Sequence, residues 1–522
     1  MSAAAPRLDA RLVAADPRLA AHAASARLPE RVLQFGEGNF LRAFADWMLQ
    51  RMNERGLFGG RAVIVQPLPR GQADALAAQD GLFTVVLRGL TDGRRVETRE
   101  LVSSVSRCID PYRDFDAFLA CARNPDLRFV VSNTTEAGIR TDPADRLDAR
   151  PAASFPGKLT QLLEARCRHF GGDPRRGLVV LPCELIDRNG DALSQAVLET
   201  ARSWDLPPAF KRWVSESCVF ANTLVDRIVT GHPRDEALEL AAHLGYRDEL
   251  LVAGELFHSW VIEAPASLAD ELPLAAAGID VVETRDLQPY RERKVRILNG
   301  AHTLMALVGF LAGQDTVGGC MDDELVRTYV ERALGREILP TIAFPAPKLE
   351  AFAASVAERF RNPFIRHPLS AIALNSVSKF RARLLPALLE GARSTGRPPA
   401  HLTFALAALA AVYRASVVED GALIGRRGGV PYRLQDEPRV LAFFVMAWRA
   451  CPPGAESPEA CLALARRLLA RDDFWGADLT AAVAGLDAAV AVFLHAILTE
   501  GAPAALARLV EREPRLAAGG GP

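Results

Sequence analysis

Short apolar runs rich in β-branched residues alternate with amphipathic helical patterns over the first half of the chain. Seven of these runs have the length and composition of strands: RVLQF (31–35), AVIVQ (62–66), FTVVL (83–87), RFVVSN (128–133), LVVLP (178–182), WVIEA (260–264) and IDVVET (279–284). Between them, apolar residues recur at helical spacing over 40–55, 115–123 and 158–170. Alternation of this kind predicts a parallel sheet that helices cover on both faces.

The pattern changes near residue 285, after which strand-like runs almost disappear. Apolar residues then recur with a helical period, for example over 290–313, 401–415 and 478–498. Helical faces of this kind need other helices as partners. The sequence therefore predicts two domains, an α/β domain over 1–285 and a mostly α-helical domain over 286–522.

Composition and charge narrow the class of protein. Lys and Arg number 62 against 63 Asp and Glu, so no net field attracts nucleic acid or anionic lipid. The N-terminal stretch lacks the apolar core of a secretory signal, and no apolar run is long enough to span a membrane. Eight cysteines occur without a C-x-x-C pair, which is typical of a reduced protein without zinc. We expect a cytoplasmic protein without nucleic-acid or membrane partners; its oligomeric state is open, and a monomer is compatible with the sequence.

A glycine-containing turn follows the first predicted strand and opens the first long helix. In FGEGNFLRAF (35–44), Gly36 and Gly38 let the backbone approach a pyrophosphate at a helix N-terminus, beside Asn39 and Phe40. The third glycine of the usual fingerprint is replaced by Leu41. A dinucleotide site and a purely structural turn are both compatible with this stretch.

The ends of the second and fourth predicted strands are the next positions at which a dinucleotide would lie. An acid after the second strand would bind the ribose of NAD, but the chain has Gln66 there, and Arg70 follows in place of an acid. After the fourth strand, Asn133, Thr134 and Thr135 are placed to face a cofactor or, alternatively, to cap a turn. The residues alone leave the choice between NAD and NADP open.

The stretch KVRILNGAH (294–302) places polar residues on an apolar helix. On an ideal α-helix, Asn299 and His302 lie about 140° and 80° around the axis from Lys294, so the three share one broad face. An amine, an amide and an imidazole together suit the reduction of a carbonyl group. The alternative is a solvated basic turn, YRERK, followed by a core helix, and both interpretations stay open at this point.

Several stretches together resemble a known family. The stretches GEGNFLRAF, SNTTEAG, PCELIDRNGDAL, TLVDRIVTG, KVRILNGAHT and RFRNPFIRH are similar to the mannitol dehydrogenase family of polyol-specific long-chain dehydrogenases, from about residue 30 to residue 490. The resemblance implies an N-terminal Rossmann-like NAD-binding domain and a helical catalytic domain. It also implies metal-independent hydride transfer, with Lys294 as general acid and base, Asn299 at the developing oxyanion and His302 orienting the substrate.

One departure from the family pattern bears on the substrate. Mannitol dehydrogenases carry a second asparagine after Cys-Asp, at a position that aligns with Leu185, whereas this chain has Glu184 followed by Leu185. We interpret the change as marking the branch that reduces tagaturonate, a 5-keto-hexonate, to altronate in hexuronate (galacturonate) breakdown. Glu184 and Asp226 are candidates for substrate contacts, and a cation among Arg361, Lys379 and Arg381 is expected to bind the carboxylate. Each of these groups is more often a surface charge or a structural partner than a ligand.

Three other functions remain as alternatives. Two are sister activities of the same family, fructuronate reductase and mannitol 2-dehydrogenase. The third, from another class, is a non-catalytic NAD-binding scaffold. The Lys294, Asn299 and His302 set disfavours the scaffold, because a scaffold does not need an amine at this position.

Overall fold

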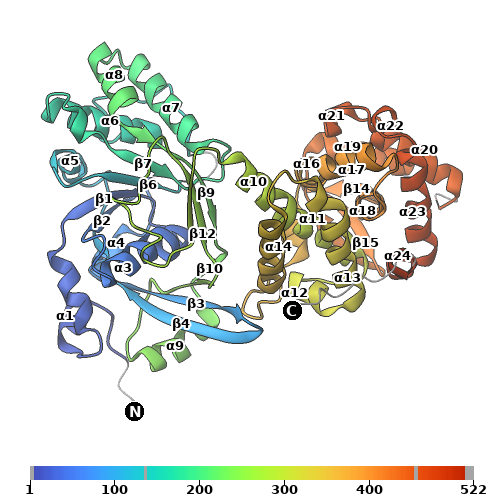
Figure 1. Ribbon diagram of the computed structural model, residues 1–522, viewed down its shortest axis with the longest axis horizontal. Coiled ribbons are helices and arrows are strands. Elements are labelled where there is room, and N and C mark those ends of the chain that lie inside the picture. Colours follow the sequence, from blue (N-terminus) through green and yellow to red (C-terminus); the bar gives the residue numbers. More distant parts are fainter. Residues whose placement is uncertain (1–4, 135–137, 452–455, 512–522) are drawn as a thin grey trace. The chain divides into compact units, whose positions relative to one another are not determined.

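The computed structural model describes residues 5–134, 138–451 and 456–511. The chain divides into two compact units, Met1–Leu287 and Gln288–Pro522. The first unit is built around a sheet, and the second is mostly helical (Figure 1). No helix among the described residues is long and apolar enough to cross a membrane.

A six-stranded parallel sheet forms the centre of the first unit. Its strands, in the order β5-β2-β1-β6-β7-β8, are Val105–Ile109, Arg61–Val65, Glu30–Phe35, Phe129–Ser132, Val179–Pro182 and Val219–Phe220. All five neighbouring pairs are parallel. The order reverses between β1 and β6, which is the doubly wound Rossmann arrangement with its ligand crevice at the carboxyl ends of these two strands. The predicted fold class is confirmed.

Both faces of this sheet are buried, because successive side chains of a strand point to opposite faces. On β1, Val32 packs into one apolar cluster and Leu33 into another. The cluster around Leu33 is covered by α5 (Phe115–Ala120), α6 (Phe155–His169), α7 (Asn189–Ser203) and α8 (Pro208–Ser217). The cluster around Val32 is covered by the first long helix and by two small sheets.

Three of the seven predicted strands lie in those small sheets, so the prediction of one parallel sheet is wrong for them. β3 (Phe83–Thr91) belongs to a four-stranded sheet with β4 (Arg94–Val102), β10 (Val229–Gly231) and β11 (Val252–Glu255). β12 (Ser259–Glu263) and β13 (Val281–Thr284) join β9 (Asn222–Asp226) in a three-stranded sheet. Apolar spacing identifies a strand but does not say which strand it pairs with.

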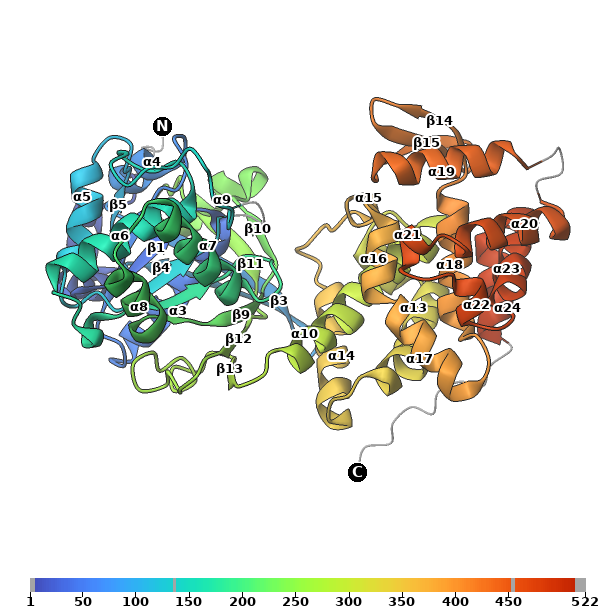
Figure 2. The same ribbon diagram turned by 90° about the horizontal axis from the view of Figure 1, so that it is seen from above.

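The second unit packs helices around one central helix, α18 (Ala400–Val412). Residues His401–Val412 of α18 are all buried, as expected for a helix that is apolar on every side. The longer helices of this unit are α13 (Glu324–Arg332), α14 (Ala346–Phe360), α16 (Ser376–Arg383), α17 (Leu385–Thr395), α19 (Pro438–Arg449), α20 (Pro458–Leu469), α23 (Leu486–Glu500) and α24 (Ala502–Glu511) (Figure 2). Four shorter helices are α12 (Val317–Asp322), α15 (Leu369–Ile372), α21 (Asp472–Trp475) and α22 (Leu479–Ala482).

A small antiparallel sheet in the second unit was not predicted. Its strands are β14 (Ala415–Glu419), β15 (Ala422–Arg427) and β16 (Val430–Leu434). The strands are joined by the pairs Asp420-Gly421 and Gly428-Gly429, all four residues having positive φ. Such pairs favour two-residue hairpin turns. The outer strands are largely exposed, which is why they lack the apolar runs that mark a buried strand.

Candidate active site

The turn after β1 lies at the point where the strand order reverses. Gly36 has a φ of 120°, and a Cβ there would approach the Asn133 carbonyl oxygen, on the turn after β6, to 3.0 Å. Gly38 is exposed, and no side chain caps the helix that begins after it. That helix runs through α2 (Asn39–Leu41), a π turn over Arg42–Asp46 and α3 (Trp47–Glu54). Glycines and free backbone amides at this edge fit a pyrophosphate group.

Asn39 and Phe40 make contacts within this helix start. Asn39 Oδ1 accepts a hydrogen bond of 2.7 Å from Arg42, and the Phe40 ring stacks on Phe44 with centroids 5.0 Å apart. Arg42 is buried and also donates to the backbone oxygens of Glu37 and Leu250, which fixes the shape of the turn. Direct contact of Asn39 and Phe40 with a cofactor stays a prediction.

An acid from the turn after β1, Glu37, lies beside the end of β2, and sequence reasoning missed it. Gln66 is buried, donates to the Leu68 carbonyl oxygen at 2.9 Å and accepts from the Ala73 N–H at 3.2 Å. A Cβ on Gly71 would collide with both the Gln66 amide and the Glu37 carboxylate, so these two side chains lie together. Burial raises the pKa of Glu37. Residues 66–70 contain no acid, but the Glu37 carboxylate of the glycine turn lies beside Gln66.

Glu184 joins the ends of β6 and β7. Its Oε1 accepts from both the backbone N–H and the hydroxyl of Thr134 at 3.0 Å, and its Oε2 accepts from Ser132 at 3.1 Å. Asn133 adds a bond of 2.7 Å to the Cys183 carbonyl oxygen. Burial raises the pKa of the Glu184 carboxyl. The structure therefore gives Glu184 a positioning role; a substrate contact stays a prediction, and Thr135 lies outside the described residues.

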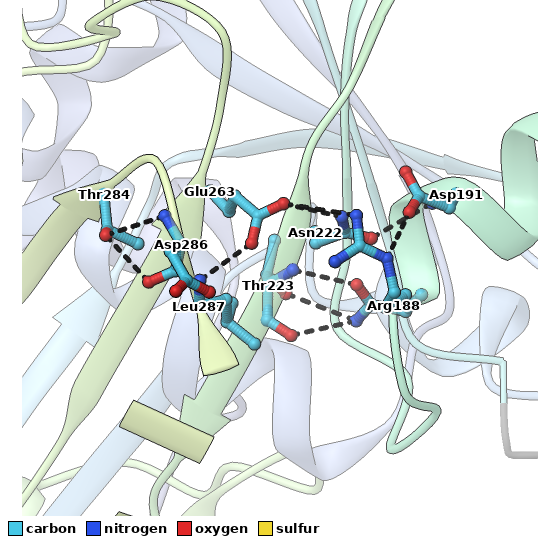
Figure 3. Close-up of polar contacts among 9 residues, drawn as sticks. Arg188, Asp191, Asn222, Thr223, Glu263, Thr284, Asp286 and Leu287 are labelled. Carbon is cyan, nitrogen blue, oxygen red and sulfur yellow. Dashed lines mark hydrogen bonds and ion pairs between the residues drawn. The ribbon is translucent and has the colours of Figure 1, made fainter. Parts of the chain in front are cut away.

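A polar network holds the loop after β7 and the end of the first unit (Figure 3). Arg188 bonds Asp191 at 2.5 Å and Glu263 at 3.5 Å, and Glu263 also accepts from Asn222 at 3.1 Å. The other Glu263 oxygen accepts from the Leu287 N–H at 2.8 Å. Leu287 is the last residue of the first unit, so this network fixes the chain just before Gln288.

Asp226 ends β9 in a buried position, next to a buried arginine. Arg227 donates to the Ala43 carbonyl oxygen at 2.6 Å and to the Phe257 carbonyl oxygen at 3.1 Å. It therefore ties the first long helix to the loop before β12. A substrate contact by Asp226 stays a prediction.

Lys294, Asn299 and His302 lie along one helix whose winding departs from an ideal α-helix. Lys294 ends α10 (Gln288–Lys294), a π turn spans Val295–Asn299, and His302 lies in α11 (Gly300–Leu304). In the π turn, the Gly300 N–H bonds to the Val295 carbonyl oxygen, five residues earlier. Because π winding stacks residues five apart, Lys294 and Asn299 lie closer around the axis than the 140° or so of an α-helix.

Gly300, the residue after Asn299, is buried and marks a close approach of another helix. A Cβ there would lie 3.3 Å from Leu384 Cδ2 and 3.8 Å from the Arg383 carbonyl oxygen. The glycine of the Asn-Gly pair therefore allows this helix to pack closely against the end of α16. The Asn299 side chain is partly exposed, while its backbone oxygen accepts from Thr303 at 3.0 Å.

His302 is a buried imidazole with an unused ring nitrogen. Its ring lies 4.6 Å from Phe360 and 4.9 Å from His367, measured between centroids. Burial is the main cause that lowers the pKa of His302 well below its usual range. Four nearby basic groups lower that pKa further: His367, Arg383, Arg359 and Lys379. The imidazole is therefore neutral near neutral pH, and its buried Nε2 has no hydrogen-bond partner among the described residues.

Comparison with known proteins identifies the family. Residues 30–276 match the mannitol dehydrogenase Rossmann domain, and residues 286–437 match the mannitol dehydrogenase C-terminal domain. An altronate oxidoreductase of Enterobacter sp. (strain 638) is 46% identical over 482 residues, which cover 92% of this chain and 97% of that protein. The chain belongs to the mannitol dehydrogenase family.

A second relative and two solved structures extend the comparison. An altronate oxidoreductase of Escherichia coli O7:K1 is 46% identical over 91% of this chain and 96% of its own. Among solved structures, a substrate-free D-sorbitol dehydrogenase aligns with a TM-score of 0.74, and mannitol 2-dehydrogenase of Pseudomonas fluorescens, in complex with NAD and D-mannitol, with 0.67. Both are 23% identical to this chain. The alignment covers 92% of this chain for the sorbitol dehydrogenase and 94% for the mannitol 2-dehydrogenase, and 96% of each solved chain, which shows a shared fold. The resemblance that the sequence motifs indicated is confirmed.

The predicted carboxylate-binding cations of this family member lie in different surroundings. Arg361 is exposed and pairs with Glu331 at 3.4 Å, and Arg381 is exposed beside Gly476. Lys379 is partly buried and donates to the Ile372 carbonyl oxygen at 2.8 Å. Lys379 is one of the basic groups that lower the pKa of His302. A carboxylate role stays a prediction for all three residues.

Sequence reasoning missed the part that Arg383, Arg359 and His367 play around His302. Arg383 belongs to α16, four residues after Lys379 and on the same face of that helix. Arg359 is buried at the end of α14, and His367 lies in the segment that follows α14. Arg359 and His367 are the two ends of the RFRNPFIRH stretch, but the sequence does not show that they and Arg383 converge on His302, because this depends on the packing of three segments.

Proposed function

We propose that the chain is an NAD-dependent oxidoreductase that interconverts tagaturonate and altronate in hexuronate breakdown in the cytoplasm. The observation that carries the proposal is the identity of 46% with altronate oxidoreductases over more than nine-tenths of the chain. The solved polyol dehydrogenases reach only 23% over a similar length. The amine, amide and imidazole of Lys294, Asn299 and His302 are the chemistry that carbonyl reduction requires.

The first unit would hold NAD at the carboxyl ends of β1, β2 and β6. The bare turn at Gly36 and Gly38 and the uncapped amides after it fit the pyrophosphate, and Glu37 beside Gln66 fits a ribose hydroxyl. When bound, this cofactor accepts or donates a hydride. The other residues of the crevice, Asn133 and Thr134, are held in place through Cys183 and Glu184.

The second unit would supply the groups that handle the substrate oxygen. In the reducing direction the carbonyl carbon gains a hydride, and Lys294 Nζ donates a proton to the oxygen. The Asn299 amide donates to that oxygen while negative charge develops on it, and neutral His302 uses Nε2 to orient a hydroxyl or the reacting oxygen. In the oxidising direction Lys294 takes the proton back.

Steady-state kinetics with NADH on tagaturonate, fructuronate and fructose test the proposal. We expect tagaturonate to have the highest kcat/KM of the three. Fructuronate or fructose as the best substrate would assign the chain to a sister activity instead. Tight NADH binding without turnover on any of these substrates would support the scaffold alternative.

NADH is expected to be preferred over NADPH. A 2′-phosphate at the end of β2 would meet the Glu37 carboxylate, and like charges at close range disfavour binding. The measurement is the ratio of kcat/KM for the two cofactors at saturating tagaturonate. Glu37→Gln is expected to reduce the ratio, whereas a preference of the unchanged protein for NADPH would show that Arg70 governs the choice.

Chelators are expected to leave the activity unchanged. Among the residues that the structure describes, no group of three or more His, Cys, Asp or Glu side chains is placed to hold a metal ion. The assay compares initial rates before and after prolonged incubation with EDTA. A loss of rate that a divalent metal restores would contradict a metal-independent reaction.

A further inference from the structure

Arg383 is a partly buried cation that has no acidic partner in the part of the chain that the structure describes. Its guanidinium lies beside the helix that carries Asn299, where Nη1 donates to the Thr303 hydroxyl at 3.2 Å and to the Asn299 carbonyl oxygen at 3.4 Å. No carboxylate among the described residues forms an ion pair with it. Burial alone lowers the pKa of Arg383 to about 10. Removing a guanidinium from water without pairing it is costly, so arginines in such positions normally bind an anion.

The free edge of this guanidinium has the geometry that carboxylates prefer. Both hydrogen bonds of Arg383 use Nη1, which leaves Nε and Nη2 without a hydrogen-bond partner among the described residues. These two nitrogens form the fork that binds both oxygens of a carboxylate in parallel. The bonds through Nη1 meanwhile fix the group against Asn299 and Thr303.

The other basic groups near Arg383 are Lys379 and the imidazoles of His302 and His367. Burial lowers the pKa of both imidazoles, so the positive charge beside Arg383 comes from Lys379. The acid that acts on Lys379 is Asp436, which already accepts from the Tyr413 hydroxyl and from the Glu437 N–H. The cluster therefore has donors and positive charge, but the described residues supply no acceptor for the fork of Arg383.

We propose that Arg383 binds the carboxylate of the 5-keto-hexonate through its Nε and Nη2 and so selects acids over neutral sugars. This inference rests on the proposed function and names the residue that recognises its substrate class. Three carbon atoms separate the carboxylate from the keto carbon, a span of about 5 Å in an extended chain. Arg383 is bonded to the backbone of Asn299, and the proposal requires its fork to lie about this distance from an oxygen held by the Asn299 amide.

The decisive variant is Arg383→Gln, which keeps a polar side chain but removes the charge and the fork. We expect KM for tagaturonate to rise about 100-fold, with kcat changed less than 10-fold, and fructose kinetics to stay as in the unchanged protein. Arg383→Lys keeps the charge and is expected to raise KM about 10-fold. NADH binding and the thermal midpoint, measured for each variant, establish that the chain is folded.

Arg393→Gln is the matched control. Arg393 lies on α17, the next helix, with an exposed side chain that pairs with Glu390. All kinetic constants of this variant are expected to equal those of the unchanged protein. If Arg383→Gln does not fold, Arg383→Lys carries the test through the same comparison of KM values.

Two results would overturn the inference. Equal losses on tagaturonate and fructose in Arg383→Gln would mean that Arg383 only clamps α16 to the helix of Asn299. Unchanged KM for tagaturonate would mean that another group binds the carboxylate. If the unchanged protein does not reduce tagaturonate at all, the proposed function is wrong. If it does reduce tagaturonate but Arg383→Gln gives one of the two results above, only the inference about Arg383 is wrong.

Discussion

Lys294→Ala is expected to lose most of its turnover while NADH binding stays nearly intact. Lys294 ends α10 one π turn before Asn299, so the two side chains lie on a common side of the helix. A positioned general acid or base contributes about 10²- to 10⁴-fold to a rate. We expect kcat for tagaturonate at neutral pH to fall by a factor in this range, and the dissociation constant of NADH, measured by fluorescence, to change little.

Lys348→Ala is the control for the loss of an amine. Lys348 is exposed in the first turn of α14, and its removal is expected to leave both kcat and NADH binding unchanged. A near-normal rate of the Lys294→Ala variant at neutral pH would contradict the role of Lys294 as general acid and base. An equal loss of NADH binding would instead indicate a structural effect.

The part of the expected nucleotide site that is formed by consecutive residues could be predicted from the sequence. Strand β1, the turn at Gly36 and Gly38 and the helix after it are consecutive, and each follows from apolar spacing and glycine chemistry. Glu37 was not recognised, because its place beside Gln66 depends on the turn around Gly71, 34 positions later in the chain. The proximity of Glu37 to Gln66 becomes apparent only when the pairing of β1 with β2 is known.

Strand pairing was the weakest part of the prediction. The runs in β3, β12 and β13 have the apolar character of central strands, yet each pairs outside the parallel sheet. A cue was present for β3, since Asp92-Gly93 joins it to β4 and both residues have positive φ. Two-residue turns of this kind predict an antiparallel neighbour, and the same cue at Asp420-Gly421 marks the small sheet of the second unit.

The helix that carries Lys294, Asn299 and His302 shows what helical periodicity can and cannot predict. Spacing alone places Lys294, Asn299 and His302 on a broad face, but it assumes 3.6 residues per turn throughout. The π turn over Val295–Asn299 changes that angle, and no residue pattern in the stretch signals it. Arg383 could not be assigned from sequence, because only the packed structure shows that no acid among the residues it describes pairs with this side chain.

Tagaturonate is expected to be reduced roughly 10³-fold more efficiently than fructose, because leaving a partly buried cationic site without its anion costs several kcal/mol. The two substrates have the same chain length, and only tagaturonate carries a carboxylate. The basic groups around His302, with Lys379 and Arg383 on one face of α16, supply the positive charge. The measurement is the ratio of the two kcat/KM values with NADH.

Single substitutions locate the source of this discrimination. Lys379→Met is expected to reduce the preference for tagaturonate, because Lys379 lies in the cluster around His302. Arg361→Gln and Arg381→Gln are expected to retain it, since Arg361 pairs with Glu331 and Arg381 lies beside Gly476, both on exposed surface. If Lys379→Met and Arg383→Gln both keep the full preference, the carboxylate is bound outside this cluster. If the kcat/KM for fructose equals that for tagaturonate, the assignment as a reductase of keto-hexonates is wrong. Mannitol 2-dehydrogenase would then be the better assignment.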